Sequence, residues 1–158
     1  MLNRTSWLSF IPFLAVCLAA AGLGAAVTRR SAQIWHPRLR EPEWNPPYWV
    51  FAPVWIFLYT LMALSAWLIW RQGSWREVDG ALALFWIQLG LSCAWSFIFF
   101  ERRAIGAAFV EILLLWMMTI ATTVAFYSIS FLAAWLLLPY IAWVGFTSYL
   151  NFRTWQMN

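Results

Sequence analysis

Very few side chains in this sequence could carry out acid–base, nucleophilic or metal chemistry. The 158 residues include one histidine, His36, and two cysteines, Cys17 and Cys93. Both cysteines fall inside apolar runs, so we expect neither a structural disulfide nor a metal site from them. The sequence contains no recognisable nucleophile–base pair. This pattern favours a binding role over catalysis and predicts no catalytic residue, no metal and no required cofactor.

Aromatic side chains are the main resource for binding, and they concentrate between Glu41 and Tyr59, in EPEWNPPYWVFAPVWIFLY. Asn45 ahead of two prolines predicts a helix start, and Pro53 predicts a kink inside the helix. Four residues of this helix recur on one face: Tyr48, Ala52, Trp55 and Tyr59. Such a face could form the wall of a pocket, or its rings could be interfacial anchors and packing.

Two further aromatic stripes carry polar groups between their rings. One, within residues 80–100, consists of Phe85, Gln88, Ser92, Trp95 and Phe99. The other, within residues 131–155, consists of Tyr140, Trp143, Thr147, Leu150 and Thr154, with Asn151 beside it. A glutamine inside a membrane helix should face protein or a cavity rather than lipid. The three stripes together predict a mostly apolar pocket for a flat, apolar ligand.

Glu111 is the one ionisable carboxylate that lies well inside an apolar segment. An acidic group in a membrane helix is costly and is a functional candidate by default. Glu111 lies two helical turns beyond Arg102 and Arg103, however. We therefore expect a structural ion pair near the membrane surface or a neutral, hydrogen-bonded acid.

Composition excludes an ordinary soluble domain, because 64% of the residues are hydrophobic and only 10% are charged, whereas soluble proteins have about 25% charged residues. Charge-free windows long enough to cross a bilayer recur along the chain. They predict an all-α integral membrane protein, a single domain over residues 1–158 built as a five-transmembrane-helix bundle. The predicted helices are 7–27, 46–70, 80–100, 104–127 and 131–155.

The distribution of arginines predicts the orientation. With five crossings, the side of the N-terminus carries Arg4, Arg71 and Arg76. The other side carries seven: Arg29, Arg30, Arg38, Arg40, Arg102, Arg103 and Arg153. The positive-inside rule therefore places the C-terminus and the 29–45 loop in the cytoplasm. No basic cluster lies on a soluble face, so we expect no nucleic-acid partner.

Two segments could mediate closure or association. The long loop 29–45 contains Trp35, Pro37, Pro42 and Trp44, and is either a lid or an interfacial loop with its tryptophans at headgroup level. Gly90 and Ala94 form a small-x-x-x-small surface that could pack against another helix.

Four blocks of the sequence resemble one known family. They are WNPPYWVFAPVWIFLY (44–59), QLGLSCAWSFIFF (88–100), ATTVAFY (121–127) and LLLPYIAWVGFTSYLNFRTWQMN (136–158). On these blocks the chain is identified as a member of the translocator protein family, also called TspO/MBR, the tryptophan-rich sensory proteins or the peripheral benzodiazepine receptor. The resemblance covers nearly the whole chain after the first helix.

The resemblance implies a five-helix bundle, often a homodimer, that binds porphyrins such as protoporphyrin IX, the haem precursor, and synthetic isoquinoline carboxamides and benzodiazepines in one cavity. It also suggests a sterol partner, and a sterol-type pattern is present at Val144, Tyr149 and Arg153. The ligand-binding residues that follow from the stripes and the resemblance are Trp35, Pro46, Phe51, Ala52, Trp55, Gln88, Ser92, Trp95, Ala107, Val110, Leu114, Trp143, Thr147 and Leu150.

The chain departs from the family pattern at five positions, so family affinities should not carry over unchanged. His36 replaces a tyrosine and Glu41 a lysine in the loop. Within the helices, Phe85 replaces a tyrosine, Ser92 an asparagine, and Thr147 a small residue. The pocket thus loses an amide and a phenol.

Three functions remain open from the sequence. The first is a membrane receptor or carrier for a tetrapyrrole, whose ring would stack on tryptophans and whose propionates would meet loop arginines. The second is a light- and oxygen-dependent porphyrin-degrading protein, in which the ligand is the photosensitiser. The third is a non-catalytic regulatory protein of a tetrapyrrole or stress pathway.

Overall fold

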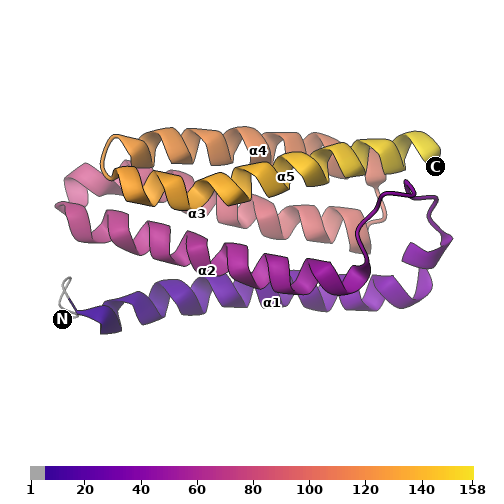
Figure 1. Cartoon of the computed structure of the whole chain (residues 1–158), viewed down its shortest axis with the longest axis horizontal. Helices are drawn as coiled ribbons and strands as arrows, with labels where there is room; N and C mark the ends of the chain where they lie inside the picture. Colours follow the sequence, from indigo (N-terminus) through magenta and orange to yellow (C-terminus); the bar gives the residue numbers. More distant parts are fainter. Residues whose placement is uncertain (1–5) are drawn as a thin grey trace.

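A computed structural model describes residues 6–158, apart from the side chains of Ala32, Tyr48 and Trp75. Over this range the chain forms a bundle of five long helices (Figure 1): α1 (Phe10–Ile34), α2 (Tyr48–Gln72), α3 (Trp75–Ser96), α4 (Ile105–Tyr127) and α5 (Phe131–Met157). Each contains a segment long and apolar enough to cross a membrane. The protein is therefore an integral, multi-pass membrane protein, and the predicted fold class is confirmed. Arg4 and the side chain of Tyr48 lie outside the described residues.

The helices pack in the cyclic order α1, α2, α5, α4, α3, so that each contacts two main neighbours. The connection between α1 and α2, the α3–α4 connection and the C-terminus lie at one end of the bundle, called here the loop end (Figure 1). The N-terminus and the other two connections lie at the opposite end. Trp55 and Tyr59 of α2 are directed toward α5, its antiparallel neighbour.

The first loop is shorter than predicted, because α1 continues through Arg29 and Arg30 to Ile34. Charged residues end the membrane span, but arginine, alanine and glutamine are good helix formers and extend the helix beyond it. The start of α2 also differs from the prediction. α2 begins at Tyr48 after Pro47, and the Asn45 side chain donates a hydrogen bond to Glu41 in the loop instead of capping the helix.

The connection between α2 and α3 is also shorter than predicted. A capping box at the start of α3 explains this. The Glu77 carboxylate accepts two hydrogen bonds from Ser74, one from the backbone N–H at 2.9 Å and one from the side-chain hydroxyl at 3.0 Å. These contacts satisfy helix-start groups that would otherwise lack partners. α3 consequently begins at Trp75, five residues before the predicted start at residue 80.

α3 ends in a π-helical turn, Phe97–Glu101, which the sequence analysis did not predict. Such turns occur mostly as short insertions and frequently near functional sites. Arg103, which follows, has a φ of 55°, a left-handed conformation that is uncommon outside glycine. This backbone turns the chain sharply into α4.

Hydrogen bonds and tight packing hold the helices together, because lipid is as apolar as a leucine side chain and gives helices little hydrophobic reason to associate. Ser65 Oγ donates to the Ala133 carbonyl at 2.7 Å and joins α2 to α5. Trp67 Nε1 donates to Ser9 Oγ at 2.9 Å and joins α2 to the start of the chain. Each such bond contributes about 0.6 kcal/mol in membrane proteins.

Candidate ligand-binding site

An aromatic cluster fills the space between α2 and α5 in the half of the bundle nearer the loop end. The Trp143 ring meets Trp55 edge to face, with centroids 6.2 Å apart, and meets Phe51 at 5.6 Å. Trp55 also contacts Tyr140 at 6.3 Å. The stripes predicted on these two helices therefore meet. In this structure their rings touch, so a flat ligand would have to part them.

A polar centre lies beside this cluster and joins three helices. The hydroxyl groups of Tyr59 and Ser92 are 2.6 Å apart, and Tyr140 Oη donates to the same Ser92 Oγ at 3.1 Å. All three side chains are buried. The small hydroxyl of Ser92 accommodates two tyrosines at once.

Three side chains near this centre bury polar atoms that have no hydrogen-bond partner among the described residues. They are the amide nitrogen and oxygen of Gln88, the indole nitrogen of Trp143 and both carboxyl oxygens of Glu111. Gln88 lies one turn before Ser92, and Trp143 lies one turn after Tyr140. Leaving such a group unpaired costs about 1–3 kcal/mol. These donors and acceptors are thus available to a ligand that carries complementary polar atoms.

Neither arrangement expected for Glu111, the ion pair with the nearby arginines or the hydrogen-bonded neutral acid, is present among the described residues. Arg102 and Arg103 are exposed at the turn between α3 and α4, whereas the Glu111 carboxyl oxygens are buried without a partner. Glu111 lies between Ala108 and Ile112, two buried residues on the inward side of α4. The two arginines lie in the turn ahead of α4, which begins at Ile105, so their nearness to Glu111 in the sequence does not produce an ion pair.

Trp95 belongs to a different set of contacts from Trp55 and Trp143. Its indole nitrogen donates to Asn151 Oδ1 at 3.1 Å, and its ring stacks on Phe99 at 5.3 Å. Asn151 in turn donates to the carbonyl of Ile105 at the start of α4. Trp95 therefore links α3 directly to α5, and through Asn151 to the start of α4.

The remaining predicted site residues are distributed over several surroundings. Thr147 is buried and donates to the Trp143 carbonyl at 2.9 Å. Trp35, Pro46 and Leu150 are half-buried, and Ala52 is exposed. On α4, Val110 and Leu114 are 67% and 49% exposed, and Ala107 is exposed too. These three point away from the aromatic cluster, toward the outside of the single chain.

The sterol-type pattern does not form one continuous exposed surface. Val144 is fully buried in the core of the bundle, whereas Tyr149 and Arg153 are exposed. The pattern therefore describes residues of α5 that lie on different sides of the helix.

The loop between α1 and α2 is held against the bundle at its start and near its middle. His36 Nε2 lies 2.9 Å from Glu41 Oε1, and the His36 ring stacks on Phe100. Trp35 meets Phe99 edge to face at 5.7 Å. Arg40 exchanges two backbone hydrogen bonds with the side chain of Asn158, at 3.0 and 2.8 Å. Two of the family departures, His36 and Glu41, thus pair with each other.

Sequence reasoning missed these loop contacts for identifiable reasons. Nothing in Phe97–Glu101 distinguishes a π-helical turn from the end of an α-helix, and Asn158 lies 118 residues from its partner. The joint presence of His36 and Glu41 is a signal that could have been found, because two residues able to pair with each other depart from the family pattern together.

The sequence matches one known protein family over most of its length. The model of the TspO/MBR family matches residues 13–156, which include α2, α3 and α4 entirely and nearly all of α1 and α5. The chain belongs to the TspO/MBR family. The resemblance inferred from its sequence blocks is confirmed.

Similar family members occur in mammals and bacteria. A translocator protein of Bos taurus is 38% identical over 154 residues, which cover 96% of this chain and 91% of that protein. A tryptophan-rich protein TspO of Chlorobaculum tepidum is 40% identical over 147 residues, which cover 92% of each chain. A tryptophan-rich sensory protein of Cereibacter sphaeroides is 34% identical over 152 residues, which cover 96% of this chain and 92% of that protein.

Proposed function

We propose that this protein is a membrane receptor or carrier that binds a flat tetrapyrrole of the porphyrin type between α2, α3 and α5. One observation carries the proposal: aromatic rings from facing helices lie close to buried polar atoms that have no hydrogen-bond partner among the described residues. A porphyrin has a large apolar face for stacking and polar atoms that could pair with such groups.

The contacts between the rings imply that binding includes a conformational step. Trp143 contacts both Phe51 and Trp55, so the ligand must separate rings that pack against one another. The loop between α1 and α2 contacts the bundle at the same end, and it would have to move away for the ligand to enter from the aqueous side. Binding of this kind should be slower than diffusion, because only the opened fraction of molecules is competent.

Titration of the purified protein with protoporphyrin IX in the dark, followed by tryptophan fluorescence, tests the proposal. We expect saturable quenching at one porphyrin per chain, and an association rate that levels off as porphyrin is increased. Quenching that rises linearly without saturation would contradict a site. Conversion of the porphyrin to a bilin-like pigment only under light would replace the receptor function with degradation.

We also propose that the loop end faces the cytoplasm. The arginine count of seven to three supports this orientation through the positive-inside rule. A reporter fused after Asn158 should be active only on the cytoplasmic side. Activity confined to the other side would reverse the proposed topology.

A further inference from the structure

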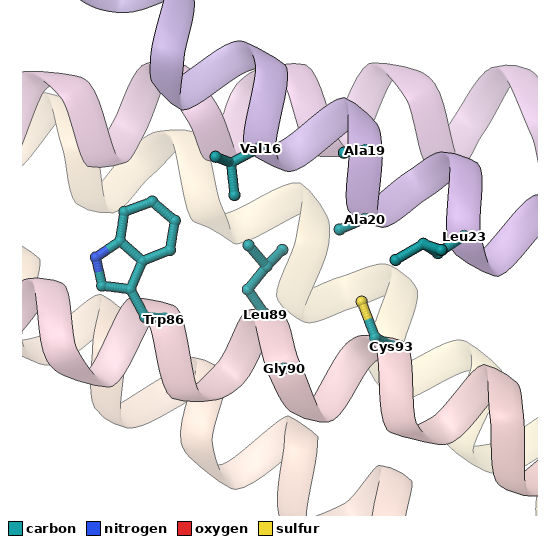
Figure 2. A pocket seen from close by; sticks show the side chains of 8 residues that line it. All are labelled: Val16, Ala19, Ala20, Leu23, Trp86, Leu89, Gly90 and Cys93. Carbon is teal, nitrogen blue, oxygen red and sulfur yellow. The ribbon is translucent and has the colours of Figure 1, made fainter.

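Two hollows lie on the outside of the bundle, along α1. The first is a groove of about 360 Å³ between α1 and α3 (Figure 2). α1 lines it with Val16, Ala19, Ala20 and Leu23. α3 lines it with Trp86, Leu89, Gly90 and Cys93. Small residues on both walls leave the space open, and a Cβ at Gly90 would meet no neighbouring atom within 4 Å.

The second hollow lies further along α1, at the loop end, and is basic. It measures about 390 Å³ and is lined by Ala26, Arg29, Arg30 and Gln33. The two arginines are exposed, and within the described range of the chain neither forms an ion pair with a carboxylate. This hollow is thus a concentrated, unneutralised positive charge beside an apolar surface.

The two hollows follow one stripe of α1. Val16, Leu23 and Arg30 are seven residues apart in turn, which keeps them on nearly the same face of a helix. At 1.5 Å per residue, Leu23 lies about 10 Å and Val16 about 21 Å from Arg30 along the helix. The hydrocarbon of one leaflet is about 15 Å deep, half of a bilayer core. The groove therefore begins within the leaflet below the arginines and extends to about the middle of the membrane.

We propose that this stripe of α1 binds one acidic phospholipid from the leaflet at the loop end. One acyl chain lies in the groove between α1 and α3, and the phosphate is held by Arg29 and Arg30. Guanidinium groups bind phosphate oxygens through paired, charge-assisted hydrogen bonds. The proposal is independent of the tetrapyrrole site, because none of the groove residues belongs to the aromatic cluster.

Charge and depth favour this occupant over the alternatives. A lipid without net charge would leave the two arginines unneutralised, and a free phosphate would leave the groove unfilled. A second copy of the chain packed on α1 around a two-fold axis normal to the membrane would bring its own arginines to the same depth. Like charges would then face each other, which disfavours that arrangement.

Native mass spectrometry of the full-length protein tests the proposal. The probes are palmitoyl-oleoyl phosphatidylglycerol, phosphatidylcholine with the same chains, dihexanoyl phosphatidylglycerol and inorganic phosphate. We expect one phosphatidylglycerol per chain, retained at least about tenfold better than phosphatidylcholine, as two basic contacts predict. The short-chain lipid should be retained poorly, and phosphate should not displace the long-chain lipid.

Two variants separate the headgroup contact from the chain contact. Arg29→Gln with Arg30→Gln should abolish the preference for phosphatidylglycerol, whereas Arg38→Gln with Arg40→Gln, at the same end, should retain it. Gly90→Leu should fill the groove and lower retention of the long-chain lipid. Gly22→Leu is its control, because Gly22 is equally open but does not line the groove. Ala19→Leu fills the groove from the α1 side should Gly90→Leu reduce folding.

Three results would overturn the proposal. Equal retention of phosphatidylglycerol and phosphatidylcholine would remove the headgroup contact. Retention unchanged in folded Gly90→Leu and Ala19→Leu proteins would remove the groove. Loss of a dimer on filling the groove, in light scattering and without any lipid adduct, would assign the surface to a second copy of the chain.

Discussion

α1 and α2 have the same length, 25 residues, yet they occupy the bundle differently. α1 contains the more apolar segment, but only 11% of the residues in that segment are buried, against 44% for α2. In water the more apolar helix would be the more buried. In a membrane the lipid solvates aliphatic side chains, so burial selects helices whose polar and aromatic groups find partners in other helices.

The same contrast separates the two candidate binding regions. The interior region between α2, α3 and α5 contains buried polar atoms and aromatic rings in edge-to-face contact, which suits a ligand with both polar atoms and an aromatic ring system. The outer region on α1 contains an apolar groove and exposed arginines, which suits a lipid. Each prediction below therefore compares a variant of an interior residue with a variant of an exposed residue. The comparison tests whether contacts between helices determine ligand binding and stability.

The largest expected difference is between two tryptophans of α5. Trp143→Ala removes a ring that contacts Phe51 and Trp55, and it should weaken protoporphyrin IX binding by about tenfold or more, equivalent to about 1.4 kcal/mol. Trp143→Phe should weaken it much less. Trp135→Ala is the control, since Trp135 is exposed near the other end of the same helix. Quenching titrations with equal losses at both positions would mean that the porphyrin partitions non-specifically.

A smaller effect is expected at Gln88, where removing a polar group should not lower the free energy of unfolding. Its amide is fully buried without a partner, so Gln88→Leu should raise the free energy of unfolding by about 1 kcal/mol or leave it unchanged. The same change should weaken porphyrin binding several-fold if the amide contacts the ligand. Ile87→Leu, on the exposed side of α3, should change neither quantity. Destabilisation of the folded Gln88→Leu protein by more than about 1 kcal/mol would show that the amide has a structural role.

A third, still smaller effect concerns the hydroxyl group of Tyr140. Tyr140→Phe keeps the ring but removes its hydrogen bond to Ser92, and it should lower the free energy of unfolding by about 0.6 kcal/mol. Tyr127→Phe alters an exposed tyrosine and should have no measurable effect. Reversible unfolding in mixed detergent would measure both, and indistinguishable values would mean that the polar centre contributes nothing to stability.

The smallest expected effect is at Glu111. Because its carboxyl oxygens have no hydrogen-bond partner, Glu111→Gln breaks no ion pair and should leave the free energy of unfolding within about 0.5 kcal/mol of the original. Glu101→Gln, at an exposed position, provides the comparison. A loss of about 3 kcal/mol or more, typical of a broken buried pair, would restore the structural role expected from the sequence.

The sequence by itself determined the number of helices, their approximate limits and the residues that share a face of each. These properties follow from local hydropathy and from the 3.6-residue period, and both can be read within a single segment. The blocks around Trp44–Tyr59 and Leu136–Asn158 also identified the family, which depends on residue order rather than on contacts.

Only the tertiary structure decided which faces meet. Trp55 and Trp143 are in contact, but Trp95 is held by Asn151, and neither outcome is contained in the stripe of any one helix. Ser92 bonds to tyrosines 33 and 48 residues away, and the Glu111 carboxyl oxygens are buried without the expected arginines. In lipid, local hydropathy does not rank helix faces, so packing and hydrogen bonding between distant segments determine which side chains form the interior.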